Sequence, residues 1–311
     1  MTNKATPYGQ KKQPSTESLS VSQLLDEGES VFIEHGIYFG HGTDSAWDEA
    51  VSILSYVLNF PPNADRSLMT NIPTTEQVVR IRSLFGRRIE ERIPAPYITG
   101  QAWFCGLPFV VDQRVIIPRS PIAALITSYF EPWLPCSPKR ILDLCTGGGC
   151  IGISCAYGFD EAEIVLSDIS ADAIAVASIN IENHKLGGRV TAIKSDLFEG
   201  LKGQCFDLIV SNPPYVNQAD LASMPEEFRH EPELALASGD DGLDFTRRLL
   251  QQAADYLTSD GALIVEVGNS GVALERAFPS VPFMWFEFTE GDGGVFMLTQ
   301  AQLAEHGESF A

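Results

Sequence analysis

The sequence is short of positive charge and of long apolar runs. Its 311 residues include 21 Lys and Arg against 41 Asp and Glu, for a formal net charge of −20. Nucleic-acid binders need Lys and Arg to neutralise phosphates, so this balance disfavours direct nucleic-acid binding and favours a basic partner. No apolar run approaches the ~20 residues of a membrane helix, so no membrane association is predicted.

Cysteine pairs and metal-ligand spacings are also missing. The six cysteines form no C-x-x-C pair, and the five histidines are scattered. This usage predicts buried thiols in a reducing compartment, hence a cytoplasmic protein, and no metal site. Residues 1–18 contain basic and turn-forming residues without an apolar core, so they predict a disordered tail and not a signal peptide or anchor.

The apolar pattern changes twice after this tail. Residues 19–94 have helical spacing, and residues 95–118 are aromatic and β-branched, broken by Gly and Pro, which predicts a β-hairpin connector. From 119 to 311, strand and helix patterns alternate, which predicts an α/β domain with a mostly parallel sheet. The last two strands favour an antiparallel hairpin. The predicted strands are 139–145, 162–168, 190–194, 206–211, 261–267, 281–288 and 294–299.

The helical part, 19–94, carries recognisable caps. Thr43 or Asp44 can cap a helix with the apolar face Trp47, Ala50, Val51, Leu54, Val57 and Leu58. Thr74, with Gln77 three residues later, predicts a capping box. The helix that follows carries five arginines, which form either a solvated face or a surface for RNA or for the other domain: Arg80, Arg82, Arg87, Arg88 and Arg92.

A glycine-rich turn follows the first predicted strand of the α/β domain. The strand ends at Asp143 and runs into Thr146-Gly147-Gly148-Gly149 before a helix. Backbone amides are exposed at such a turn, where α/β sheets bind ligands. Asp168 ends the next strand, 19 residues after Gly149, where a carboxylate can accept hydrogen bonds from both hydroxyls of a ribose.

Two nucleotide cofactors fit this pattern. Gly147, Gly149 and Gly152 satisfy G-x-G-x-x-G with an acid about 20 residues on, so a nicotinamide-dependent oxidoreductase stays open. However, Asp143 followed by small residues at alternate positions resembles the D/E-x-G-x-G-x-G loop of S-adenosylmethionine-dependent methyltransferases. Cys145 stands where that loop usually has its first glycine.

The third strand ends in "KSDLF". In methyltransferases of this class, a side chain at the end of the third strand often contacts the adenine of the cofactor. Asp196, together with Leu197, is therefore a further candidate for cofactor binding. An Asp that closes a strand is also ordinary turn chemistry.

The fourth strand ends in Asn212-Pro213-Pro214-Tyr215. A planar amide or base nitrogen is a poor nucleophile because its lone pair is delocalised. The Asn212 side-chain oxygen and the Pro213 carbonyl can each accept one of its N–H groups, which aims the nitrogen at a methyl group and stabilises developing positive charge. The prolines make the turn rigid, and Tyr215 supplies an aromatic wall.

Together these motifs resemble the protein-(glutamine-N5) methyltransferases, which modify release factors or a ribosomal protein. The resemblance covers nearly the whole chain beyond the tail and includes "ILDLCTGGGCIGI", "VLSDIS", "SNPPYV", "FRHEPELALASGDDGL" and "EVGNS". "HGTDSAWDEA" and "WFCGLPF" resemble the branch that acts on large-subunit ribosomal protein L-three. The release-factor branch usually reads "PRPETE" where this chain has "PRSPI".

The resemblance implies a class I methyltransferase fold, a Rossmann-like seven-stranded sheet with a terminal antiparallel hairpin, after a helical substrate-recognition domain. It implies S-adenosylmethionine as cofactor, held by the 143–149 loop and Asp168, and ribosomal protein L-three as the basic protein substrate at Asn212 to Tyr215. Residues 219–245 contain eight acidic residues and one arginine, so they could bind such a basic substrate. The alternative is that they form a solvated loop.

Other functions stay open at this stage. The alternatives are a release-factor glutamine methyltransferase, an adenine-N6 nucleic-acid methyltransferase, a nicotinamide-dependent oxidoreductase and a cofactor-binding module without catalysis. The sequence leaves open which glutamine is modified and the oligomeric state.

Overall fold

The chain folds into two compact units. The computed structural model describes residues 19–61, 65–288 and 293–310, so the predicted tail, 1–18, lies outside the described residues. The helical unit comprises Met1–Gln101 with Pro225–His230, and the sheet unit comprises Ala102–Met224 with Glu231–Ala311. No helix in the described ranges combines the length and the hydrophobicity that a membrane span requires.

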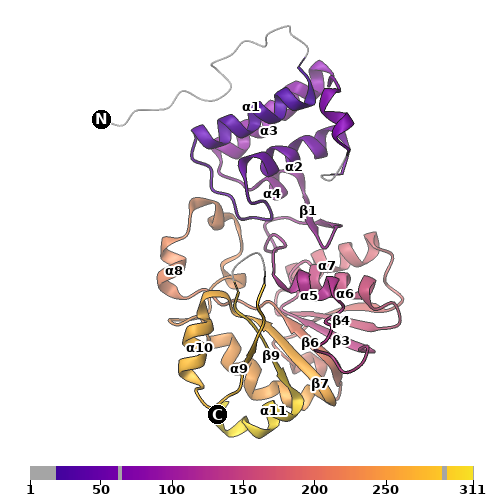
Figure 1. Ribbon diagram of the computed structural model, residues 1–311, viewed down its shortest axis with the longest axis vertical. Helices are drawn as coiled ribbons and strands as arrows, with labels where there is room; N and C mark the ends of the chain where they lie inside the picture. Colours follow the sequence, from indigo (N-terminus) through magenta and orange to yellow (C-terminus); the bar gives the residue numbers. More distant parts are fainter. Residues whose placement is uncertain (1–18, 62–64, 289–292, 311) are drawn as a thin grey trace. The chain divides into compact units, whose positions relative to one another are not determined.

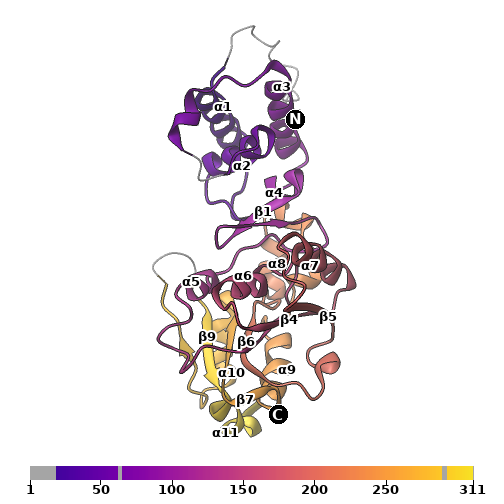
Figure 2. The ribbon, with the colours of Figure 1, turned by 90° about the vertical axis from the view of Figure 1, so that its right-hand side faces the viewer.

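Three helices surround one apolar core in the helical unit (Figure 2): α1 (Val21–Glu34), α2 (Ala46–Leu58) and α3 (Thr75–Glu90). Gly28 permits close packing, because a Cβ at this position would lie 2.6 Å from the Phe85 ring and 2.8 Å from the Ala50 Cβ. The predicted capping box is confirmed, since the Thr74 hydroxyl accepts from the Gln77 amide and the Gln77 side chain accepts from the Thr74 amide.

The predicted cap of α2 is wrong. Ser45 caps this helix, because its hydroxyl accepts from the Asp48 amide at 3.2 Å. Thr43 instead donates its hydroxyl to the buried carboxylate of Glu49 at 2.6 Å. Thr43, Asp44 and Ser45 are all residue types that can cap a helix, but α2 begins at Ala46, so Ser45 occupies the cap position.

The arginines in α3 are engaged within the helical unit and do not form a uniform solvated face, and Arg92 lies beyond the end of this helix. Arg88 is fully buried and its Nε donates to Glu49 at 2.6 Å. Arg82 makes a two-point contact with Glu27, at 2.7 and 2.8 Å. Arg92 donates to the main-chain carbonyls of His35 and Gly36.

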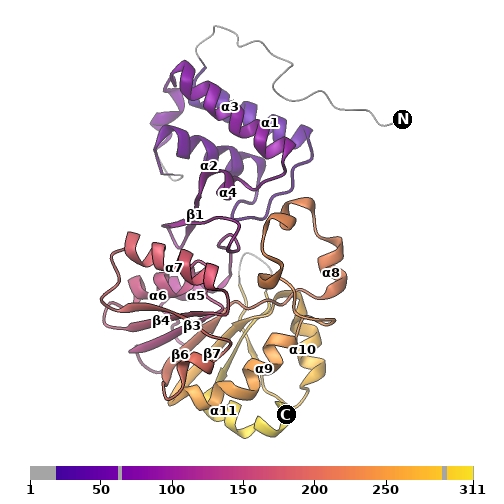
Figure 3. The same ribbon diagram turned by 180° about the vertical axis from the view of Figure 1, so that it is seen from behind.

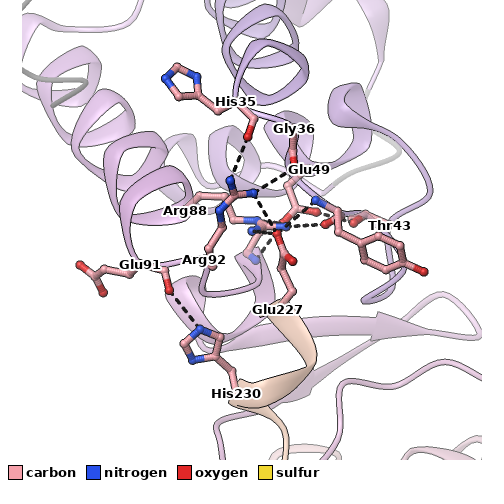
Figure 4. A network of polar contacts seen from close by, with 11 residues as sticks. His35, Gly36, Thr43, Glu49, Arg88, Glu91, Arg92, Glu227 and His230 are labelled. Atoms are coloured by element: carbon pink, nitrogen blue, oxygen red, sulfur yellow. Dashed lines mark hydrogen bonds and ion pairs between the residues drawn. The ribbon is translucent and has the colours of Figure 1, made fainter. Parts of the chain in front are cut away.

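The segment Pro225–His230 belongs to the helical unit although the chain on either side belongs to the sheet unit (Figure 4). Glu227 anchors it: its Oε1 accepts from the Tyr38 amide at 3.1 Å and lies 3.4 Å from Nη1 of both Arg88 and Arg92. A carboxylate that is removed from water needs such donors, so Glu227 fixes this segment on the helical unit.

The connector combines a helix and a hairpin. Residues Ala95–Thr99 form α4, followed by β1 (Gln101–Phe104) and β2 (Leu107–Val110), which pair as a two-stranded sheet. Pro96 lies in the first turn of α4, where a missing amide hydrogen costs nothing, and Gly100 ends the helix with a φ of +73°. The hairpin predicted over 95–118 is therefore restricted to 101–110.

In the described residues, the main sheet of the sheet unit has seven strands in the order β5-β4-β3-β6-β7-β9-β8. The first five are parallel to one another, and β9 runs antiparallel to β7 and β8, so the predicted fold class is confirmed. The strands are β3 (Arg140–Leu144), β4 (Glu163–Asp168), β5 (Val190–Lys194), β6 (Phe206–Ser211), β7 (Leu257–Glu266), β8 (Met284–Trp285) and β9 (Val295–Thr299).

Two strand predictions need correction. The strand β7 begins at Leu257, four residues earlier than 261, and its register against β6 shifts between Phe206 and Leu208. The strand predicted over 281–288 is reduced to Met284–Trp285. The Phe283 amide donates to the Val281 carbonyl at 2.9 Å, so it does not pair with β9 and the strand starts only at Met284.

Helices cover both faces of the sheet (Figures 1 and 3). Ile141 packs in one core with side chains of α5 (Ile122–Thr127), α6 (Cys150–Gly158) and α7 (Ala171–Asn183). The next residue, Leu142, packs in the opposite core with side chains of α9 (Asp244–Gln252), α10 (Gly271–Ala277) and α11 (Gln300–Glu305). Because both faces are buried, the strands read as continuous apolar runs.

The buried ion pair of Arg88 provides a test of this organisation. Arg88→Met would leave Glu49 buried without its cation, so the free energy of unfolding should fall by about 3–5 kcal/mol. Arg87→Met is the matched control, since the side chains of Arg87 and Glu91 are 44% and 48% exposed and their pair contributes less than about 1 kcal/mol. Urea denaturation of both variants measures this, and equal losses would contradict the assignment.

Candidate active site

A cavity of about 300 Å³ opens in the sheet unit beyond the carboxyl ends of β3, β4 and β6. Residues at or just after the end of each of these strands line it, among them Gly147, Asp168 and Asn212. Parallel strands bring their carboxyl ends to one edge, so three motifs that are far apart in the sequence meet here. Of the predicted site residues, the cavity is lined by Cys145, Gly147, Asp168, Asp196, Leu197, Asn212 and Pro214.

Asp168 holds the glycine loop against the cavity. Its Oδ2 accepts from the Gly147 amide at 2.9 Å and its Oδ1 accepts from the Ser170 amide at 2.9 Å. Each carboxylate oxygen keeps a second lone pair, which suits the two hydroxyls of a ribose. Burial raises the pKa of Asp168. Gly147 has a φ of +54°, and a Cβ there would meet no atom within 4 Å, so the loop leaves room above it.

Asp143 lies beneath the loop and does not line the cavity. It is fully buried, and its Oδ2 accepts from the Thr146 hydroxyl at 2.5 Å and from the Gly152 amide at 2.8 Å. Burial raises the pKa of Asp143, and these two hydrogen bonds lower it. The effect of burial is larger, so the resulting pKa is about 7. Asp143 and Thr146 thus shape the loop, and Gly149 begins α6 with a φ of +86°.

Gly152 is a packing residue. A Cβ there would lie 2.2 Å from Leu166 Cδ2 and 2.9 Å from Asp143 Cβ, so only glycine lets α6 approach the sheet at this point. The third glycine of the apparent G-x-G-x-x-G pattern is therefore explained by close helix packing.

Asp196 and Leu197 form another part of the cavity wall. The carboxylate of Asp196 accepts from Nη2 of Arg248 at 2.9 Å, and both residues line the cavity. Leu197 is buried with a φ of +47°. Arg248 could not be identified from the sequence, since nothing in an amphipathic helix 52 residues downstream marks one arginine as a partner of Asp196.

The structure fixes the orientation of the Asn212 side chain. Its Nδ2 donates to the main-chain carbonyl of Arg119 at 3.3 Å, which assigns the amide so that Oδ1 points away from Arg119. Asn212 and Pro214 line the cavity, whereas Pro213 is buried outside its lining. The Ser211 hydroxyl donates to the Leu144 carbonyl at 2.6 Å and holds the ends of β6 and β3 together.

Tyr215 is held by a buried carboxylate. Its hydroxyl donates to Oε1 of Glu266 at 2.8 Å, and the Ser120 hydroxyl donates to Oε2 at 2.5 Å. Burial, together with the negative charge of Glu266, raises the pKa of Tyr215. Burial also raises the pKa of Glu266. The phenol therefore stays protonated and acts as a donor to Glu266.

Two glycines make room for Tyr215. Gly268 has a φ of +45°, and a Cβ there would lie 2.6 Å from the Tyr215 ring. Gly242 has a φ of +79°, and a Cβ there would lie 2.3 Å from the Tyr215 carbonyl, which also accepts from the Ser270 hydroxyl at 2.8 Å. The segments "GDDGL" and "EVGNS", to which the sequence analysis gave no separate role, thus form the support of this turn.

The acidic segment 219–245 is partly internal. Glu227 and Glu231 are buried, and each is paired with arginine. Asp241 and Asp244 both pair with Arg247. Much of the negative charge that could have formed a docking surface is therefore neutralised within the chain.

The buried Asp143 predicts a pH effect on stability. Its pKa is about 7 in the folded chain, compared with an ordinary value of 3.8 for an exposed Asp. Between these two pH values, the carboxyl is therefore protonated in the folded chain and ionised in the unfolded chain. The stabilisation from this carboxyl is therefore full below about pH 4 and is lost as the pH rises to about 7, by at most about 1.4 kcal/mol per pH unit.

Asp143→Asn removes this titration. The free energy of unfolding of the original chain, minus that of the variant, should fall with rising pH and level off above about pH 7. Urea denaturation of both chains across this range measures it, and a difference independent of pH would contradict the assignment.

Comparison with known proteins agrees with this geometry. The family model described as "Methyltransferase small domain" matches residues 125–240. The fold is similar to the hMettl16 catalytic domain, solved in complex with MAT2A 3'UTR hairpin 6, with a TM-score of 0.50 at 15% identity over 79% of this chain and 92% of that one. At this identity the likeness concerns the fold alone.

Two relatives are similar over most of their length. A ribosomal protein uL3 glutamine methyltransferase of Francisella tularensis subsp. tularensis (strain SCHU S4 / Schu 4) is 49% identical over 278 residues, which is 89% of this chain and 88% of the relative. The protein of the same name from Neisseria gonorrhoeae (strain ATCC 700825 / FA 1090) is 46% identical over 298 residues, 94% of this chain and 98% of the relative. This chain belongs to the family of ribosomal protein uL3 glutamine methyltransferases.

Proposed function

We propose that this chain transfers a methyl group from S-adenosylmethionine to the side-chain amide nitrogen of a glutamine in ribosomal protein uL3, in the cytoplasm. The names of both relatives support the substrate, and the placement of Asn212 supports the chemistry. With Nδ2 committed to the Arg119 carbonyl, Oδ1 is the atom of Asn212 that can accept an N–H of the substrate amide.

The cavity has the features that S-adenosylmethionine requires. Asp168 would accept hydrogen bonds from the ribose hydroxyls, and the loop at Cys145 and Gly147 would lie along the cofactor. Asp196 and Leu197 would lie beside the adenine. When bound, the cofactor supplies an activated methyl group on a positively charged sulfur.

The residues of the turn would prepare the amide nitrogen for attack. The Asn212 oxygen and the Pro213 carbonyl would each accept one N–H, which orients the nitrogen and stabilises positive charge as it forms. Tyr215, fixed by Glu266, would support the planar amide from one side. The Tyr215 hydroxyl donates to Glu266, so it is not a base; the product nitrogen would release its proton to water.

Methylation assays test the function. The chain is incubated with methyl-labelled S-adenosylmethionine and, separately, with purified uL3, a release factor, and adenine-containing DNA and RNA, followed by mass spectrometry. We expect one methyl group on a uL3 glutamine. In Asn212→Ala, kcat should fall about 10²–10³-fold because a positioned hydrogen-bond partner of the reacting group is lost.

Each alternative product has a definite meaning. Label on the release factor alone would overturn the substrate but keep the chemistry, and label on adenine would transfer the role of Asn212 to a nucleic acid. Loss of cofactor binding in Asn212→Ala, without a separate loss of kcat, would contradict the role of its side chain.

Asp168→Ala should weaken cofactor binding first. Hydrogen bonds to a charged group contribute about 1.5–3 kcal/mol, so the Kd of S-adenosylmethionine should rise about 10- to 100-fold in calorimetric titration. Asp172→Ala is the matched control, because this exposed acid of α7 does not line the cavity and its loss should leave the Kd within about twofold. An unchanged Kd in Asp168→Ala would refute the ribose assignment.

A further inference from the structure

Glu231 is a second buried carboxylate beside the Asn212 turn, with a side chain that is 0% exposed. It lies in the sheet unit, on the segment that follows the turn, and the next residue, Pro232, lines the cavity. The proposed chemistry gives Glu231 no contact with substrate or cofactor, so its burial needs another explanation.

A set of short hydrogen bonds surrounds this carboxylate. Its Oε1 accepts from Nη1 of Arg119 at 2.6 Å and from the Ile117 amide at 3.0 Å, and its Oε2 accepts from Nη2 of Arg119 at 2.6 Å. Arg119 Nη1 also donates to the Ile117 carbonyl at 3.2 Å. This two-point geometry fixes the plane of the guanidinium, and Pro118 restricts the backbone between the two residues.

Arg119 connects Glu231 to the candidate catalytic side chain. The guanidinium of Arg119 is held by Glu231, and its main-chain carbonyl accepts from Nδ2 of Asn212 at 3.3 Å. An asparagine amide can rotate by 180° at little steric cost because its oxygen and nitrogen are similar in size. The position of this one carbonyl therefore selects which end of the amide faces the cavity.

We propose that Glu231 is a positioning residue for methyl transfer. Glu231 binds the guanidinium of Arg119 and so fixes the position of the Arg119 main-chain carbonyl. This carbonyl accepts from Nδ2 of Asn212, which leaves Oδ1 directed at the substrate nitrogen. This inference rests on the proposed function. Glu231 acts on the Asn212 side of the turn, as Glu266 acts on Tyr215.

A double-mutant cycle with Asn212 distinguishes positioning from general structural support. Glu231→Gln loses the charge that holds the guanidinium, and kcat for uL3 should fall about tenfold, within the range seen for coupled neighbours. The KM for uL3 and the Kd of S-adenosylmethionine should change less than about twofold. In an Asn212→Ala background the same substitution should change kcat by less than about twofold, because no side-chain amide remains to be oriented.

Glu227→Gln is the matched control. Glu227 is also buried and precedes Glu231 by four residues, but it accepts hydrogen bonds from the Tyr38 amide and from Arg88 and Arg92 of the helical unit, the two arginines labelled in Figure 4. Its effect on kcat, whatever its size, should be the same in the original and the Asn212→Ala backgrounds.

A second variant keeps the inference testable if Glu231→Gln does not fold. Arg119→Lys retains the cation and the main-chain carbonyl but loses the two-point contact, so kcat should fall several-fold with the same dependence on Asn212. An unchanged kcat, or equal losses in the two backgrounds, would overturn the role of Glu231 alone. Absence of uL3 methylation by the original chain would overturn the proposed function and this inference with it.

Discussion

A carboxyl group that is removed from water gains stability from each hydrogen-bond donor that it contacts, and the donors of the buried acids connect several segments of this molecule. In the part of the chain that the structure describes, five acidic side chains are buried: Glu49, Asp143, Glu227, Glu231 and Glu266. Each fixes a segment that the apolar cores alone would leave less defined, because hydrophobic burial has no direction whereas a hydrogen bond has one. The geometry of the site therefore depends on the buried acids of the sheet unit, Asp143, Glu231 and Glu266, as well as on the sheet.

The carboxylates divide the task between the two sides of the site. Asp143 and Asp168 hold the loop that follows β3, where the cofactor is proposed to bind. Glu231 and Glu266 hold the turn that follows β6, where the substrate amide is proposed to bind. Because the two sets share no residue, binding of the cofactor and orientation of the amide can be separated by mutation.

The interior acids also change the meaning of the net charge of −20. From composition, the acidic residues of 219–245 could form either a docking surface for a basic substrate or a solvated loop. In the structure Glu227 and Glu231 are inside, and Asp241 is paired with Arg247, so composition overstates the exposed charge. The same holds for the arginines of α3, since Arg88 is fully buried and Arg82 is paired with Glu27.

The motifs that carry the fold were readable from the sequence, because each is local. The glycine turn after β3, the Asp that ends β4 and the Asn-Pro-Pro-Tyr turn after β6 are set by backbone preferences within a few residues. Strand alternation also predicted the sheet, with errors at β7 and β8. The reason for each glycine could not be inferred from the sequence. Gly147 borders the cavity, whereas a side chain at Gly152, Gly242 or Gly268 would clash with residues that are distant in the sequence.

The sequence by itself thus determined the class of fold, the order of the motifs and the chemistry that the turn at Asn212 can support. Only the tertiary structure decided which groups hold that turn, since Arg119 and Glu266 approach it from segments more than 50 residues away and Glu231 acts through Arg119. It also decided which acids are buried and which face of the Asn212 amide is turned to the cavity. These depend on distances between remote side chains, and no local pattern in a single sequence encodes such distances.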